Sequence, residues 1–470
     1  MANTWDRLIK GGFLVDPANG KYGRFDLAIE AGRIAAVAPK LEGEAREVTF
    51  TTAHVFPGLV DPHLHLGSVF GSPYGARMAA MAGVTTCLDM AGPFDDLLKH
   101  ADRTGAGINV ASIEGFSPGE LFGTLSPTDA QMRDFIRTTI EKGSIGVKLM
   151  GGHWPLPLAT SRRMVELCNE AGVYVAWHAG SETAGSNILG MREAVEAVRG
   201  LKLHLAHINA YCRGRVRPVL DEVLEAEAML AENPGIWSES YVSPMNGTIL
   251  TCDAKGDVID HVTRTCLASF GLEPTRQGIV EAIRRGCLFV VRDTGLVSEL
   301  TGGDEAIRVW EEAGTATAGS FPVNPALSRF YLAQAKRADG TFLVDALSTD
   351  GGCIPRNVTL ATGLSLVKFG ALTLNEFVLK ASLTPARHLR LFDRGQLGVG
   401  AAADVTIVDL ERQRATETIV AGRTVMKDGI LLGSGTTFVT TAAGREHLEK
   451  LGFGVLETDF SGEEPERIRV

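Results

Sequence analysis

The sequence lacks the features that mark a secreted, membrane-spanning or nucleic-acid-binding protein. No stretch reaches 18 consecutive apolar residues, and the opening MANTWDRLIKGG has no apolar segment of the signal-peptide kind. The seven cysteines are scattered without a CxxC pair, which indicates free thiols in a reducing compartment. There is no basic run and the net charge is −10, so we expect neither nucleic acid nor a membrane as partner. These absences predict a cytoplasmic protein.

Glycine is the one residue type in clear excess. The chain has 54 glycines among 470 residues, about 11%, against an average near 7%. Hydrophobic residues make up 45% and charged residues 22%, which is ordinary for a globular chain with a large core. High glycine content without low complexity predicts many tight turns between strands and helices.

The middle of the chain alternates short apolar runs with amphipathic stretches. This rhythm predicts parallel strands joined by helices, and about eight such units close into a (β/α)8 TIM-like barrel. The apolar runs that we interpret as strands are GLVDPHLHLG (58–67), GVTTCLDM (83–90), INVASI (108–113), IGVKLM (145–150), VYVAWHAG (173–180), LKLHLAHIN (201–209) and FLVDALSTDGG (342–352).

Both ends of the chain have a different character, with alternating apolar residues and Gly-containing turns. We therefore predict a small β-sandwich domain built from residues 1–57 and 396–434. The barrel would span 58–395, with an insertion around 242–341 over its mouth, where loops that carry function belong. Residues 435–470 form an extension that neither domain explains.

Residues able to bind metals recur at the predicted strand ends, the part of such barrels that carries function. His63 and His65 are two apart on one strand, so both point to the same face and could chelate a metal such as Zn²⁺. An isolated HxH is weak evidence, but further ligand types fall at later strand ends. These are Lys148, His178, His207 and Asp350.

The motifs PGLVDPHLHLG, WHAG, LAHIN and STDGG, together with IGVKLMGGH around Lys148, resemble those of the amidohydrolase superfamily. The resemblance covers about residues 5–430 and includes the β-rich ends. It implies two divalent metals, expected to be Zn²⁺. His63, His65 and Asp350 would hold one metal, and His178 and His207 the other. Lys148, converted by CO₂ into an anionic carbamate, would bridge them.

The same resemblance implies hydrolysis of a C–N amide bond. A hydroxide bridging the metals would attack the carbonyl, with Asp350 as general base and then general acid. Asp61 would support the metal site from behind. His153 could donate a hydrogen bond to the developing oxyanion, or could simply stack on Trp154 and Pro155. Cys87 is either a sulfur ligand, as in N-acyl-D-amino-acid deacylases, or a core residue. His204, three residues before His207, should pack against a helix.

The substrate stays open at this stage. Lys148 favours hydantoinase-like and dihydroorotase-like enzymes, which open cyclic amides, imides or hydantoin-like rings. HAGSETAGSNILGMREAVEAV and SESYVSPMNG instead resemble N-acyl-D-amino-acid deacylases and isoaspartyl dipeptidases. A third alternative is a non-catalytic assembly protein, which metal analysis would reveal. We expect a small-molecule substrate and a homo-oligomer. The candidates for substrate binding are Asn209, Tyr211, Tyr241, Arg292 and Arg356.

Overall fold

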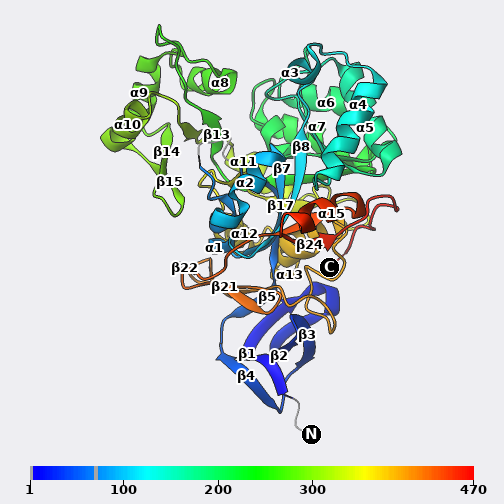
Figure 1. Ribbon diagram of the computed structural model, residues 1–470. Coiled ribbons are helices and arrows are strands. Elements are labelled where there is room, and N and C mark those ends of the chain that lie inside the picture. Colours follow the sequence, from blue (N-terminus) through cyan, green and yellow to red (C-terminus); the bar gives the residue numbers. More distant parts are fainter. Residues whose placement is uncertain (1–3, 68–71, 470) are drawn as a thin grey trace.

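Eight parallel strands form the centre of the molecule (Figure 1). The computed structural model describes residues 4–67 and 72–469. Seven of the strands coincide with the apolar runs named above, and the seventh strand is the exception. Each strand pairs with its neighbour in chain order. The strands are β6 (Leu59–His65), β7 (Val84–Ala91), β8 (Asn109–Gly115), β9 (Gly146–Met150), β10 (Tyr174–His178), β11 (Leu203–Leu205), β12 (Ile236–Tyr241) and β17 (Ala346–Ser348).

The eighth strand is interrupted, and this interruption closes the barrel. Its first piece, β17, pairs with β12, whereas its second piece, β18 (Gly351–Gly352), pairs with β6 at Gly352 and His65. Asp350 lies between the two pieces. The predicted (β/α)8 TIM-like barrel is therefore confirmed, and the ends of its first and eighth strands lie side by side.

Helices cover the outside of the barrel. In the fourth unit, α4 begins after Thr128, whose side chain and that of Gln131 form a reciprocal capping box. Met132, Ile136 and Ile140 recur every four residues and are buried against the sheet. The helices are α1 (Gly75–Met81), α2 (Phe94–Thr104), α4 (Asp129–Glu141), α5 (Leu158–Ala171), α6 (Ile188–Ala197), α7 (Val219–Glu232), α11 (Ala326–Gln334), α12 (Thr359–Lys368), α13 (Leu374–Val378) and α14 (Thr384–His388), with the short α3 (Pro118–Phe122) beyond β8.

Strands from both ends of the chain form one nine-stranded sheet below the barrel (Figure 1). The two halves join where β5 pairs antiparallel with β19. Apolar side chains from both halves share one buried cluster that includes Ile9, Val55, Val405 and Ile419. The strands are β1 (Thr4–Asp16), β2 (Lys21–Glu30), β3 (Arg33–Ala38), β4 (Glu44–Phe50), β5 (His54–Pro57), β19 (Val405–Asp409), β20 (Arg414–Val420), β21 (Arg423–Lys427) and β22 (Ile430–Leu431).

The segment between β12 and β17 builds a separate lobe above the barrel mouth. Figure 1 shows it opposite the lobe that contains α3 to α7. Four strands form an antiparallel sheet of their own, packed around a core that includes Leu250, Trp310 and Phe321. The elements are β13 (Asn246–Ile249), α8 (His261–Ser269), α9 (Arg276–Arg284), β14 (Phe289–Asp293), β15 (Ser298–Thr301), α10 (Gly303–Glu312) and β16 (Ala318–Phe321).

The C-terminal extension, which the sequence left unexplained, packs against the barrel at the end away from its mouth. Its first strand, β23 (Thr437–Thr440), pairs in parallel with β8, and β24 (Gly454–Glu457) pairs with β23 across α15 (Ala442–Lys450). Arg467 then forms an ion pair with the buried Asp345 (Nε–Oδ1 2.6 Å) and donates to the carbonyl oxygens of Pro234 and Ile236. The extension therefore completes the floor of the barrel.

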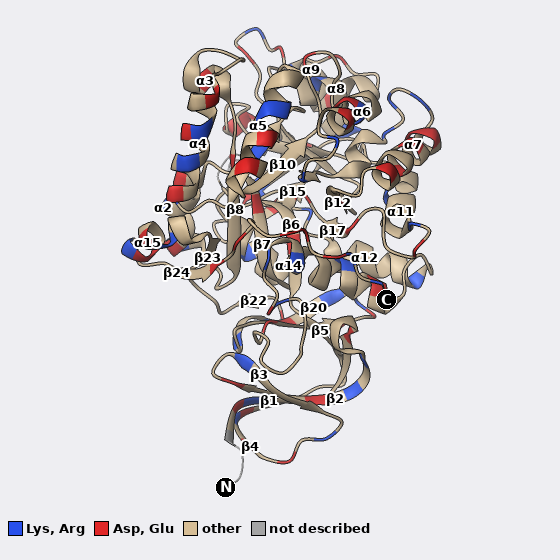
Figure 2. Cartoon of the chain, turned by 90° about the vertical axis from the view of Figure 1, so that its right-hand side faces the viewer, with Lys and Arg blue, Asp and Glu red and all other residues tan. Residues whose placement is uncertain are grey.

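Acidic and basic side chains alternate on the outer helices, as Figure 2 shows for α4 and α5. Arg163 of α5, for example, lies 2.6 Å from Asp129 and 2.9 Å from Glu166. Among residues 4–67 and 72–469, no helix is both long and apolar enough to span a lipid bilayer.

Lys380 is a buried lysine remote from the barrel mouth, and it makes stability depend on pH. It lies in η4 (Leu379–Leu383), donates to the carbonyl of Val344, and its Nζ lies 4.0 Å from the centre of the Phe342 ring. Burial lowers the pKa of Lys380 to about 7, against the opposing charges of Asp345 and Glu376. The folded state therefore binds fewer protons than the unfolded chain between about pH 7 and pH 10, so the contribution of Lys380 to stability rises with pH.

We expect Lys380→Met to be more stable than the wild type at pH 7, because the methionine removes the cost of a buried charge. This advantage should shrink by about 3–5 kcal/mol towards pH 10, where the wild-type lysine is neutral in the folded state. Urea unfolding of both proteins at several pH values measures the difference and cancels other titrating groups. A constant difference between pH 7 and pH 10 would contradict the assignment.

Candidate metal centre

Three of the predicted ligands converge where the first and eighth strands meet. Asp350 Oδ1 lies 2.9 Å from His65 Nε2 and 3.4 Å from His63 Nε2. One ligand atom from each of His63, His65 and Asp350 lies within 4.8 Å of the others, and all three side chains are buried or nearly so. Two imidazoles and a carboxylate in this arrangement are a ligand set that suits a divalent cation such as zinc.

His178 and His207 extend this cluster along the strand ends. His207 Nε2 lies 3.1 Å from His178 Nδ1, and the ring of His207 stacks on that of His63 at 5.1 Å. His178 fits only because residue 152 is glycine: a Cβ there would lie 1.9 Å from His178 Nε2. Burial lowers the pKa of both histidines well below the ordinary value, so they are neutral at pH 7, which is the form that binds metals.

The backbone at two of these positions is held in an unusual conformation. His207 has φ +36° and Asp350 has φ +49°, in the left-handed region that residues other than glycine rarely occupy. Hydrogen bonds fix both: the His207 amide donates to Glu239 (2.6 Å), and the Asp350 amide donates to the carbonyl of His63 (3.0 Å). Such strain concentrates at functional sites, because it sets the direction of a side chain.

Lys148 points into the same cluster from β9. It is 1% exposed, and among the described residues its ammonium has one hydrogen-bond partner, the sulfur of Met90 at 3.0 Å. Burial lowers the pKa of Lys148 to about 8, although the charges of Glu239 and Asp350 oppose this shift. A thioether is a weak acceptor, so the site holds a buried amine that the protein itself barely satisfies.

Glu239 of β12, which was not predicted from the sequence, contacts several residues of the cluster. It is fully buried, and its carboxylate lies 2.7 Å from His63 Nδ1, accepts the amide of His207, and accepts the hydroxyl of Ser348. Burial would raise the pKa of Glu239, but the imidazoles of His63 and His204 hold it well below its usual value. A carboxylate behind a ligating histidine fixes its tautomer and orientation.

Glu239→Gln should lower the affinity for the metal by about 10- to 100-fold, since the amide offers only one acceptor to His63, His207 and Ser348. Competition with a chromogenic chelator measures this affinity. Glu417→Gln is the matched control, because Glu417 is also buried but pairs with Arg7 in the nine-stranded sheet. An unchanged metal affinity in Glu239→Gln would show that Glu239 does not position His63.

Arg356, predicted to bind substrate, lines the cavity and pairs with Asp350. Its Nη2 lies 2.8 Å from Asp350 Oδ2, and its Nε donates to the Asp350 carbonyl. Burial alone would raise the pKa of Asp350, but the charge of Arg356, with those of His63 and His65, holds it well below its usual range. Behind His63, Asp61 accepts the backbone amide of His63 and the hydroxyl of Thr349.

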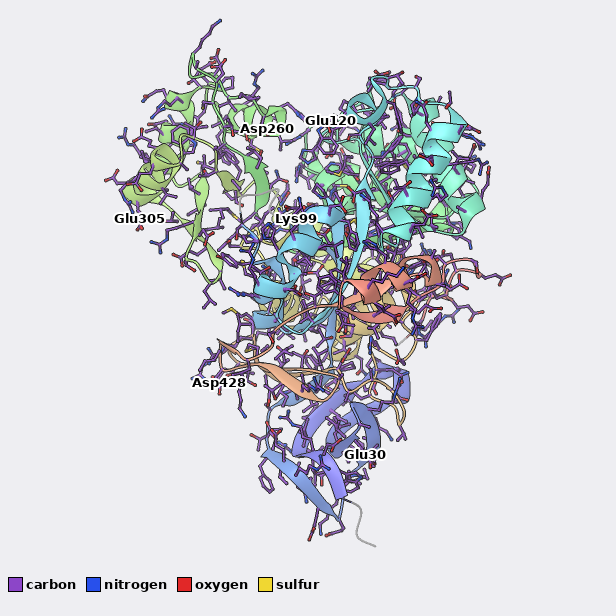
Figure 3. All side chains as sticks on the ribbon, in the orientation of Figure 1. Glu30, Lys99, Glu120, Asp260, Glu305 and Asp428 are labelled. Carbon is purple, nitrogen blue, oxygen red and sulfur yellow. The ribbon has the colours of Figure 1, made fainter. Side chains whose placement is uncertain are left out.

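A cavity of about 750 Å³ opens in front of the cluster. His63, His65, Lys148, His178, His207 and Asp350 all line it. His153 also lines it, with its ring 5.4 Å from that of His178. Figure 3 shows Glu120 and Asp260, both lining residues, at the facing edges of the two lobes. The predicted ligands therefore share one solvent-connected space that a small molecule can enter.

The other predicted residues have different surroundings. Asn209 and Tyr211 are buried and accept the backbone amides of Tyr241 and Ala179, respectively. Tyr241 lines a second lobe of the cavity, whereas Arg292 lies on β14 in ion pairs with Glu299 and Glu305.

Two further residues of the sequence analysis are buried in the barrel. His204, expected against a helix, instead hydrogen-bonds the Tyr174 hydroxyl at 2.8 Å and approaches Glu239 at 3.6 Å. Cys87 is buried, with its sulfur 3.7 Å from the carbonyl of Asn109.

Comparison with known proteins found relatives in sequence and in fold. Residues 54–228 match the amidohydrolase family. The chain is 28% identical over 435 residues to an allantoinase of Solibacter usitatus, covering 87% of this chain and 86% of that protein. It is 26% identical to a dihydroorotase of Citrifermentans bemidjiense, covering 87% and 91%. The fold matches a zinc-containing N-acyl-D-glutamate deacylase of Bordetella bronchiseptica with a TM-score of 0.63 and 17% identity, covering 92% and 99%.

Proposed function

We propose that the substrate of this chain is a cyclic amide, imide or hydantoin-like ring. The chain is a metal-dependent hydrolase of the amidohydrolase superfamily, whose members cleave C–N bonds other than ordinary peptide bonds. The observation that carries this proposal is the set of six candidate ligand residues around one cavity, together with relatives named allantoinase and dihydroorotase.

The residues of the cluster fit a pair of divalent metals. His63, His65 and Asp350 would hold one, and His178 and His207 the other. Nε2 of His207 and Nδ1 of His178 lie 3.1 Å apart, a spacing that suits two ligands of one ion. Because the donors are imidazole nitrogens and a carboxylate, we propose Zn²⁺. When bound, such metals supply Lewis-acid chemistry, polarising a carbonyl and lowering the pKa of water.

Lys148 would join the two metals as a carbamate. Its ammonium first loses a proton, and the neutral amine then forms a bond to the carbon of CO₂ and releases a second proton, so that a cation becomes an anion. The buried position of Lys148 and its weak partner, the Met90 sulfur, support this change, because an ammonium here would face the charges of two metals.

Asp350 is placed to move the proton of the reaction. Arg356 holds one of its oxygens and keeps it ionised, while the other faces His63 and His65. It would accept a proton from the attacking water and pass it to the nitrogen that leaves. His153 would donate a hydrogen bond to the oxygen that gains charge. Burial lowers the pKa of His153 to about 4, so its ring is neutral and carries one N–H at pH 7.

A second candidate is an N-acyl amino acid. Beyond the cluster, the cavity has an apolar side formed by Leu121, Phe135, Met150 and Trp154, which would suit an acyl chain. A ring of the hydantoin type does not need this surface.

One screen separates the candidates. The zinc-loaded protein is assayed on hydantoin, dihydrouracil and allantoin, and in parallel on N-acetyl-D- and N-acetyl-L-amino acids. We expect ring opening that a chelator abolishes and that Zn²⁺ restores. Deacylation without ring opening would replace the first candidate by the second. Failure on every substrate by a protein carrying two metals would overturn both.

A further inference from the structure

The cavity has a second lobe of about 400 Å³, and its charge is unbalanced. Its lining includes His178, His207 and Asp350 of the cluster together with Arg213 and Arg215. Asp350, already engaged by Arg356, is the one carboxylate among the described residues that line this lobe. Two guanidinium groups therefore face a space beside the cluster without a carboxylate of their own.

The hydrogen bonds of Arg213 all go to neutral oxygens. Its Nε donates to Asn324 (2.8 Å), and its Nη2 donates to the hydroxyl of Tyr241 (2.6 Å) and to Asn246 (2.8 Å). These bonds fix the orientation of the guanidinium but leave its charge uncompensated. Most arginines on the outer helices, such as Arg137 and Arg308, pair with glutamate or aspartate.

Arg215 is less constrained than Arg213. Within residues 4–67 and 72–469 it makes no hydrogen bond or ion pair with another residue, although it lines the lobe. Arg215 is exposed, so its side chain lies at the rim of the lobe, whereas Arg213 is half-buried. Two like charges on one short loop repel each other, and an anion between them would relieve that repulsion.

The loop that carries both arginines is held in place from below. Glu222 of α7 is fully buried and accepts the backbone amides of Gly214 (2.7 Å), Val216 (2.8 Å) and Arg217 (3.0 Å). Its carboxylate is thus hydrogen-bonded to the backbone, and its charge acts on Arg215 only from a distance. Because the backbone of this loop is already fixed, a ligand that binds there loses little free energy in ordering it.

From this geometry we propose that Arg213 and Arg215 form a subsite for a carboxylate group of the substrate. This proposal rests on the proposed amide hydrolysis. The substrate would be an amide, cyclic or acyclic, with a free carboxylate a few bonds from the bond that is cut. Guanidinium groups bind carboxylates in paired, charge-assisted hydrogen bonds, which gives direction as well as affinity.

The first test compares a matched pair of substrates, hydantoin-5-acetic acid and its primary amide. We expect the wild type to prefer the carboxylate by about 10-fold or more in kcat/KM. Arg215→Gln should remove most of that preference by raising KM for the carboxylate, with the amide unaffected. Arg308→Gln, an exposed arginine of α10 that pairs with Glu312, is the control and should keep the preference.

A second test needs no turnover. Glutarate and glutaramide are titrated into the metal-loaded wild type, Arg215→Gln and Arg213→Lys and followed by calorimetry. Glutarate binding that is weakened about 10-fold or more in both variants supports the subsite even if no hydantoin is hydrolysed, in which case only the proposed reaction fails. Equal binding of glutarate by all three proteins, or equal loss of both substrates in Arg215→Gln, would overturn the subsite.

Discussion

Asp350→Asn is expected to lower kcat/KM by about 10²–10⁴-fold, since it removes the group that accepts and returns the proton. The amide has nearly the same shape, so Asn can keep the hydrogen bond to Arg356 but has no charge to share with His63 and His65. The loss should appear in kcat rather than in KM, because binding of the substrate does not depend on this proton. Steady-state kinetics at saturating Zn²⁺ and metal analysis of the same samples separate loss of chemistry from loss of metal.

Asp345→Asn is the matched control. Asp345 is also buried in the barrel, but it faces Arg467 at the floor and lies outside the cavity. This variant should lose stability and keep its activity at temperatures where it stays folded. An Asp350→Asn protein that keeps more than a tenth of wild-type activity would rule out the proton-transfer role.

Lys148→Ala is expected to leave the chain with no more than one metal and to reduce kcat/KM by a factor of about 10³, because the anionic bridge is lost. The structure suggests a rescue. Removing the side chain leaves a hole beside Met90, and a small carboxylate such as propionate could occupy it and restore part of the charge. Metal analysis with and without added propionate measures both effects. In the wild type, metal content should rise when bicarbonate is supplied during loading.

Lys380→Met serves as the control for Lys148, because both lysines are completely buried in the barrel and only one faces the cavity. It should retain two metals and respond normally to bicarbonate. Two metals bound by Lys148→Ala without any added carboxylate would exclude the bridging role.

The barrel and the strand-end residues were predictable because a parallel strand fixes where its carboxyl end points. His63, His65, Lys148, His178 and His207 each belong to, or directly follow, a short apolar run, and seven such runs supply seven of the eight barrel strands. The expectation needed only periodicity and order along the chain. The structure brings these residues and Asp350 around one cavity.

The partners of these residues could not be read in the same way. Glu239 lies in the run IWSESY, where its role depends on His63, 176 residues away. What marks Glu239 is that it is an acid fully buried in a central strand, and burial cannot be seen in a single sequence. In the sequence, Arg356 and Arg292 were equivalent candidates. In the structure, Arg356 pairs with Asp350, whereas Arg292 of β14 pairs with Glu299. Long-range packing decides such cases.

Pairing between the two ends of the chain also constrains the order in which the protein folds. In the nine-stranded sheet, Val55 of β5 pairs with Ile407 of β19, 352 positions further along. Closing so long a loop is entropically costly unless the intervening chain is already compact. The hairpin of β1 and β2 can form early, but β5 and β19 should meet only after the barrel has brought their ends together. Within that sheet, the pairing of β5 with β19 would then be the last to gain protection from hydrogen exchange.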